Sequence, residues 1–191
     1  MRLVALAVSI PLMFIAAGFT MLLNPTCGLS ASLVTTYLVL TPLLYYARPY
    51  LAFAARPFAM AFFLMAALWA VGLVLSPMLE EPLGWVIELA SQCPQWKSYF
   101  FVGAVVLAPL VEEVVFRVIL YTELEKRVGP RVGYVGNSLA FAVVHGYLPL
   151  LPIYFTYGLV LTYAFRRGGY LAAVALHSIN NLLAFISLPL L

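Results

Sequence analysis

The chain of 191 residues contains no aspartate, only seven glutamates and only ten basic residues, so charged residues make up 9% of it. Hydrophobic residues make up 65%, and the mean hydropathy is +1.05. No soluble globular domain has this balance, so the sequence predicts an all-α, polytopic membrane protein. It leaves no room for a second, soluble domain. We expect one membrane domain, with scaffold helices in residues 1–97 and a functional core in residues 98–191.

Seven apolar segments, separated by Gly and Pro, predict about seven transmembrane helices. The first is uncharged and longer than the core of a signal peptide, so we expect a retained helix. The segments are Leu3–Leu23, Leu29–Ala47, Pro57–Leu79, Ser98–Tyr121, Arg131–Tyr147, Leu148–Phe165 and Tyr170–Leu190.

Basic residues are distributed unequally between the two predicted sides of the membrane. One side has only Lys97, and Arg117 lies within a span. The other side has Arg2, Arg48, Arg56, Lys126, Arg127, Arg131, Arg166 and Arg167. Because cytoplasmic loops carry the excess of Lys and Arg, this asymmetry predicts a cytoplasmic N-terminus and an external C-terminus. It fits a bacterial inner-membrane protein, and the dispersal of the basic residues argues against a nucleic-acid partner.

The longest connection, Glu80–Lys97, falls on the predicted outer side. Either an amphipathic helix on the membrane surface or an ordinary solvated loop accounts for its composition. Cys27 and Cys93, the two cysteines of the chain, fall on the same side. An oxidising compartment allows them to pair, but the sequence does not show that they are close, so two unpaired cysteines are the favoured expectation.

The stretch Ala108–Arg117 reads Ala-Pro-Leu-Val-Glu-Glu-Val-Val-Phe-Arg and interrupts an otherwise apolar, 24-residue run, Ser98–Tyr121. Ionisable groups in a membrane segment are costly and are kept mainly for function or for pairing. Glu113 and Arg117 are four residues apart, so they share a helix face and are expected to pair. Glu112 lies about 100° round the helix, with no basic residue one turn away. A carboxylate in these surroundings accepts a proton readily, which suits a general base.

Three further polar side chains fall at a similar depth in other predicted spans. His145 lies in the fifth span, and His177 and Asn181 lie one turn apart in the seventh. Together with Glu112, they fall within very roughly 10 Å of their segment midpoints, at a rise of about 1.5 Å per residue. Each alone is explained more simply as a hydrogen-bonding contact between helices. Together they predict one polar site within the membrane.

Three ordered motifs resemble those of the CAAX prenyl protease and bacteriocin-processing (CPBP) family. The motifs are Glu112-Glu113-x-x-x-Arg117, Phe141-x-x-x-His145 and His177-x-x-x-Asn181. Members of this family are glutamic-type intramembrane endopeptidases similar to the Ras-converting enzyme. The resemblance covers about Ser98–Phe185, and residues 1–97 match no motif. Val118 stands where members often have glycine, and the best-known eukaryotic members have eight spans rather than seven.

The resemblance implies catalysis without a cofactor or a bound metal. It implies that Glu112 and His145 activate a water, and that His177 and Asn181 stabilise the oxyanion. In the same way Glu113, Arg117 and Phe141 are expected to support the site. The implied substrate is a membrane-associated protein or peptide, lipid-modified or with a membrane-embedded tail, that is cleaved near its C-terminus.

Two other functions remain open at this point. A zinc metalloprotease would use Glu112, His145 and His177 as metal ligands. Against it, the chain has no His-Glu-x-x-His motif, and Asn181 is a poor zinc ligand. A non-catalytic transporter or immunity protein would use Glu112 as a proton-linked carboxylate. Against that, the chain has no evident internal repeat and no second set of membrane charges.

Overall fold

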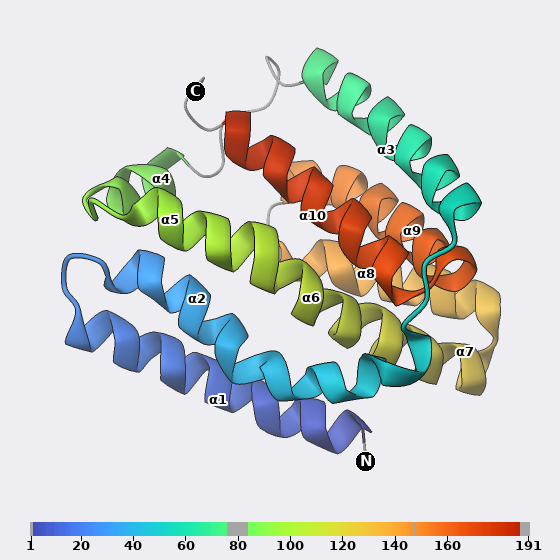
Figure 1. Cartoon of the computed structure of the whole chain (residues 1–191), viewed down its shortest axis with the longest axis horizontal. Coiled ribbons are helices and arrows are strands. Elements are labelled where there is room, and N and C mark those ends of the chain that lie inside the picture. The colour runs from blue at the N-terminus through green and yellow to red at the C-terminus, as the bar shows by residue number, and fades with distance from the viewer. Residues whose placement is uncertain (1, 76–83, 147, 188–191) are drawn as a thin grey trace. The chain divides into compact units, whose positions relative to one another are not determined.

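The computed structural model describes residues 2–75, 84–146 and 148–187, and the regular structure in those ranges is entirely helical. Figure 1 labels the helices along the chain. The prediction of an all-α, polytopic membrane protein is confirmed. Large apolar side chains such as Phe14, Leu22 and Phe63 are exposed to the extent of 67%, 81% and 71%. Such surfaces suit contact with lipid rather than with water.

Six helical runs among the described residues are long and apolar enough to cross a membrane. They are Arg2–Leu23, Gly28–Tyr50, Ala55–Val74, Trp96–Val128, Leu148–Gly168 and Tyr170–Ser187. The remaining predicted span, Arg131–Tyr147, corresponds to α8 (Pro130–Val144), which has 15 residues. At about 1.5 Å per residue it extends about 22 Å, less than the hydrocarbon thickness of about 30 Å. The predicted ends at Leu79, Tyr147 and Leu190 lie outside the described residues.

The chain forms two compact units, and the first contains Met1–Tyr46, Leu83–Glu112 and Ser178–Leu191. Here α1 (Arg2–Leu23) packs along α2 (Gly28–Leu40), and α2 also contacts α5 (Trp96–Phe100) and the π-helix η3 (Phe101–Leu107). Figure 1 shows α1 and α2 side by side. Gly28 allows the two helices to approach closely, because a Cβ there would lie 2.6 Å from the Cα of Met21. The hydroxyls of Thr20 and Thr35 are hydrogen-bonded across the same interface at 3.0 Å.

A disulfide joins Cys27 to Cys93, so the expectation of two unpaired cysteines is wrong. Cys27 precedes α2, and Cys93 lies between α4 (Gly84–Ser91) and α5. The short helix α4 packs against α2, and the Ser30 hydroxyl donates to the carbonyl of Ala90 at 3.4 Å. This contact between distant segments brings the Cα atoms of Cys27 and Cys93 to within 4.8 Å of each other. The predicted connection Glu80–Lys97 is therefore partly helical, while its residues 80–83 lie outside the described ranges.

The second unit contains Ala47–Pro82 and Glu113–His177. In it, α9 (Leu151–Gly168) packs against both α3 (Ala55–Leu75) and α8. Gly158 of α9 faces Ser138 of α8 so closely that a Cβ would lie 2.9 Å from the serine Cα. Nearby, Asn137 Nδ2 donates to Thr162 Oγ1 at 2.9 Å. Small residues and a buried polar pair thus join α8 and α9, as is usual between membrane helices.

The motif helix is one uninterrupted helical run, Trp96–Val128. It consists of α5, η3, α6 (Ala108–Glu113), the π-helix η4 (Val114–Tyr121) and α7 (Thr122–Val128). The run ends at Gly129, whose φ of 88° is the left-handed conformation that favours glycine after a helix. The polar motif Glu112–Arg117 therefore lies on a helical run with π-helical turns on both sides of α6, and such turns often occur at functional sites.

The charge asymmetry and the disulfide both predict a cytoplasmic N-terminus and an external α4. A cysteine that replaces Glu88 should react with a membrane-impermeant maleimide on intact cells. A cysteine that replaces Arg127 should react only after the cells are permeabilised. The native cysteines are paired and do not contribute to labelling. The opposite pattern, with Arg127→Cys labelled and Glu88→Cys protected on intact cells, would reject this topology.

Candidate active site

A buried ion pair holds the motif residues of the second unit together. Glu113 Oε1 lies 3.1 Å from Arg117 Nη1, and both side chains have an exposed fraction of 0%. The same carboxylate oxygen lies 2.8 Å from Nδ1 of His177 in α10 (Tyr170–Ser187). Arg117 Nη2 also donates to the carbonyl of Gly158 in α9 at 3.3 Å. One ion pair therefore connects η4, α9 and α10, although Glu113 Oε2 and Arg117 Nε are buried without a hydrogen bond to the described residues.

Phe141, in α8, lies among the motif residues of this unit. Its ring centroid is 4.6 Å from the guanidinium carbon of Arg117, which is a favourable cation–π distance. The same ring lies 4.5 Å from the ring of His145 and 5.8 Å from that of His177. It also packs edge-on against Phe116 at 5.3 Å. Members of all three motifs thus contact one buried aromatic side chain.

His145 is the C-cap residue of α8, directly after Val144. Its Nδ1 lies 2.7 Å from the carbonyl oxygen of Phe141, and its ring stacks on Tyr154 at 4.4 Å. A carbonyl oxygen can only accept a hydrogen bond, so Nδ1 must carry the proton. In the neutral ring Nε2 is then the acceptor, so it can accept a hydrogen bond from water.

Whereas the ring of His145 is bound to a backbone carbonyl, the ring of His177 is bound to a carboxylate. Its Nδ1 contacts a carboxylate oxygen of Glu113, so Nδ1 is again the donor. Nε2 can donate to an oxyanion only when the ring is doubly protonated. The carboxylate of Glu113 is placed to compensate the charge of that state.

Glu112, in the first unit, has a partner that the sequence analysis missed. The hydroxyl of Tyr37, in α2, donates a hydrogen bond to Oε1 of Glu112. Hydrogen bonds to a carboxylate are strong and fix its orientation. One signal could have identified Tyr37, because it lies near the middle of the predicted span Leu29–Ala47. Tyrosines that anchor a helix at the membrane interface lie instead near its ends.

Asn181 donates a hydrogen bond to the motif helix at the π-helical turn that precedes Pro109. In the π-helical register of η3, the N–H of Ala108 donates to the carbonyl of Gly103, five residues earlier. The carbonyl of Ala104 would need the N–H of residue 109 in the same register, and Pro109 has none. Asn181 Nδ2 donates to the carbonyl of Ala104 at 2.8 Å instead. Asn181 is therefore oriented by a carbonyl whose donor in this register would be the missing N–H of Pro109.

Asn180 also contributes to the orientation of Asn181. Its Nδ2 donates to Oδ1 of Asn181 at 3.1 Å, so the amide of Asn181 is held at both its oxygen and its nitrogen. An amide nitrogen carries two hydrogens. Asn181 can therefore donate to the carbonyl of Ala104 and to one further acceptor.

The predicted site residues are thus distributed over the two units. Glu113, Arg117, Phe141, His145 and His177 are gathered in the second, whereas Glu112 and Asn181 make their contacts in the first. In the described part of the chain, no three His, Cys, Asp or Glu side chains form a group that could hold a metal ion.

Replacement of Glu113 tests whether the ion pair has a structural role. Glu113→Gln leaves the Arg117 charge buried, and we expect the free energy of unfolding to fall by roughly 3–5 kcal/mol. The double variant Glu113→Gln/Arg117→Met removes both charges and should recover part of that loss. Thermal unfolding in detergent measures both.

Glu123 offers a matched control, because it forms only partly exposed ion pairs with Lys126 and Arg127. Glu123→Gln should change stability by less than about 1 kcal/mol. The loss of stability in the double variant could instead equal the sum of the losses in Glu113→Gln and Arg117→Met. That result would show that the two charges do not depend on each other.

Comparison with known proteins identifies the region that carries the motifs. Residues 94–183 match the model of a protein family described as type II CAAX prenyl endopeptidase Rce1-like. This range includes all three motifs. No curated protein and no solved structure gives a significant match to the chain. Residues 94–183 of this integral membrane protein are therefore similar to the Rce1-like family of type II CAAX prenyl endopeptidases.

Proposed function

We propose that this protein is an intramembrane endopeptidase of glutamic type, in which Glu112 and His145 activate the water that cleaves a peptide bond. The family match supports a membrane-embedded CAAX endopeptidase in general. The proposal that Glu112 activates the water depends on one observation, which is that two adjacent carboxylates have different surroundings. Glu113 is bound to a guanidinium and an imidazole, whereas Glu112 accepts a hydrogen bond from the neutral hydroxyl of Tyr37. The Tyr37 hydroxyl orients the Glu112 carboxylate, and an ionised carboxylate can accept a proton from water.

The proposed reaction begins with a water that donates hydrogen bonds to Glu112 and to Nε2 of His145. As the water oxygen attacks the carbonyl carbon of the substrate, its proton passes to Glu112. The resulting tetrahedral intermediate collapses with cleavage of the C–N bond, and the proton is delivered to the departing amine nitrogen. The Nδ1–H bond from His145 to the carbonyl of Phe141 supports this assignment, because it makes Nε2 the acceptor in the neutral ring.

Asn181 and His177 stabilise the negative charge on the carbonyl oxygen in this proposal. The amide of Asn181 is oriented by Ala104 and Asn180, so it is preorganised to donate its second hydrogen. His177 donates from Nε2 while Glu113 holds its Nδ1.

The surroundings of the motifs support a proposal for the substrate class. The motif helix is long and apolar enough to span a bilayer. We therefore propose a membrane-associated protein or peptide, lipid-modified or with a membrane-embedded tail, that is cut near its C-terminus. The charge asymmetry of the loops favours the inner membrane of a bacterium as its location.

Glu112→Gln tests the water-activating role. The amide oxygen can still accept from Tyr37, so the fold should be kept, but the base is lost. Turnover of a farnesylated CAAX reporter peptide should fall by about a hundredfold or more. Tyr37→Phe retains the carboxylate and removes its orienting bond, so it should lower kcat by less and leave KM nearly unchanged. Wild-type turnover in Glu112→Gln, with the thermal unfolding midpoint unchanged, would contradict the assignment.

Asn181 tests the oxyanion role, because a donor to the oxyanion acts mainly in the transition state. Asn181→Ala should lower kcat by about a hundredfold while changing KM little. Asn181→Asp places a carboxylate where negative charge develops, so it should be at least as damaging. Asn180→Ala is the neighbouring control, and it should be milder because it removes only an orienting bond. If Asn180→Ala lost more turnover than Asn181→Ala, the assignment of the oxyanion contact to Asn181 would be wrong.

A further inference from the structure

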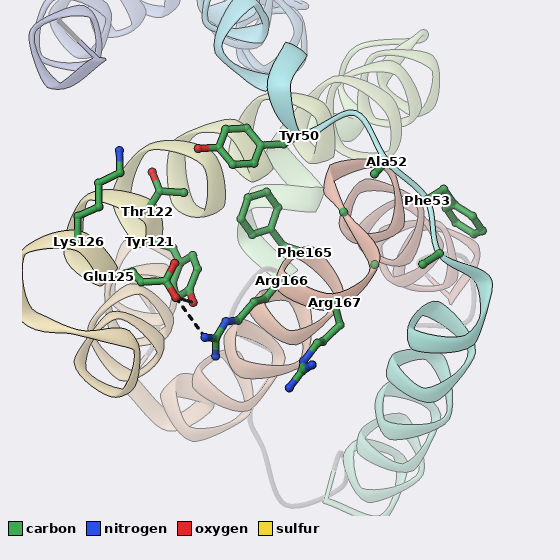
Figure 2. A pocket seen from close by; sticks show the side chains of 13 residues that line it. Tyr50, Ala52, Phe53, Tyr121, Thr122, Glu125, Lys126, Phe165, Arg166 and Arg167 are labelled. Carbon is green, nitrogen blue, oxygen red and sulfur yellow. Dashed lines mark hydrogen bonds and ion pairs between the residues drawn. The ribbon is translucent and has the colours of Figure 1, made fainter.

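A pocket of about 500 Å³ lies in the second unit, lined by none of the motif residues. Its walls come from Tyr50 and residues 52–54, from Tyr121 and α7, from the end of α9 and from Gly169. Figure 2 shows the rings of Tyr50 and Phe165 and the ion pair between Glu125 and Arg166 around it. The pocket therefore combines aromatic, apolar and charged walls at one end of the helices.

One wall of the pocket is fixed by backbone hydrogen bonds. The N–H of Ala54 donates to the carbonyl of Gly168 at 2.9 Å, and the N–H of Leu171 donates to the carbonyl of Ala52 at 3.2 Å. Gly169 has a φ of 91°, and a Cβ there would lie 2.5 Å from the oxygen of Ala52. Glycine is therefore needed at this turn, and the wall is preformed.

Positive charge exceeds negative charge in the pocket lining. The charged residues there are Lys126, Arg166, Arg167 and Glu125. Arg166 Nη2 lies 3.3 Å from Glu125 Oε1, which also accepts a hydrogen bond from the hydroxyl of Tyr121 at 2.8 Å. Arg167 is exposed and forms no ion pair or hydrogen bond with the residues that the structure describes. Arg166 is thus oriented by Glu125, and Arg167 can bind a ligand.

The chemistry of the lining fits a phosphate group with an apolar attachment. Arginine binds phosphate oxygens through two parallel hydrogen bonds. Phe53, which lines the pocket and is 51% exposed, provides an apolar contact that free phosphate would not use. The three basic residues also belong to the predicted cytoplasmic set, on the side where anionic lipids concentrate. Basic pockets between helices on that side bind lipid headgroups.

We propose that this pocket binds the phosphate of an anionic phospholipid from the cytoplasmic leaflet, with Arg167 as its direct contact. Arg166 and Lys126 add to the positive potential, and Phe53 contacts the glycerol and the first part of the acyl chains. The proposed site is separate from the motifs and does not depend on the proposed proteolytic chemistry.

Thermal unfolding of the whole protein in a neutral detergent tests this site. A ligand that binds the folded state raises the unfolding midpoint as its concentration increases. Dioctanoyl phosphatidylglycerol should raise the midpoint, whereas dioctanoyl phosphatidylcholine and inorganic phosphate should raise it much less. Arg167→Gln should weaken the apparent affinity for phosphatidylglycerol about fivefold, and Arg167→Lys should weaken it less.

Arg131→Gln is the matched control, because Arg131 is also exposed and on the predicted cytoplasmic side but does not line the pocket. It should leave the response to phosphatidylglycerol unchanged. An equal loss in Arg131→Gln and Arg167→Gln would overturn the proposal in favour of diffuse attraction between charges. If inorganic phosphate raised the unfolding midpoint as much as phosphatidylglycerol does, the ligand would be a free anion and not a lipid. If phosphatidylcholine raised it as much, the positive charge of the pocket would have no role in binding.

Discussion

The second unit depends on the buried ion pair between Glu113 and Arg117. Each of these charges would cost several kcal/mol in an apolar interior without its partners. Glu113 is bound by Arg117 and His177, and Arg117 in turn contacts Phe141 and the carbonyl of Gly158. The partners lie on different helices, so these contacts also fix the positions of motif residues. Because Glu113 has this structural role, its neighbour Glu112 is the carboxylate left for chemistry in the proposed mechanism.

A backbone constraint has a similar effect in the first unit. Non-helical hydrogen bonding within a membrane is tolerated where another group satisfies the freed polar atoms. In the π-helical register of η3 the donor to the carbonyl of Ala104 would be the N–H that Pro109 lacks, and the Asn181 amide donates to this carbonyl. The irregular turn thus orients a residue proposed to stabilise the oxyanion.

Features that depend on local sequence could be predicted. Apolar length predicted six of the seven membrane spans correctly, and the spacing of four residues predicted the contact between Glu113 and Arg117. Features that depend on tertiary packing could not. The disulfide requires α4 to pack against α2, and the hydrogen bond from Tyr37 to Glu112 joins residues 75 positions apart. The π-helical turns were also missed, because a hydrophobic pattern does not distinguish a π-helical from an α-helical register. The roles of Glu112, His145, His177 and Asn181 stay predictions.

The central claim is that Glu112 activates water directly, without a bound metal. The metal content of cleavage-competent protein, measured together with its activity in a strong chelator, tests this most directly. We expect no stoichiometric zinc and unchanged cleavage of the reporter peptide after chelation. About one zinc per chain, with cleavage that stops on chelation and returns when zinc is restored, would contradict the claim and assign the protein to the metalloproteases.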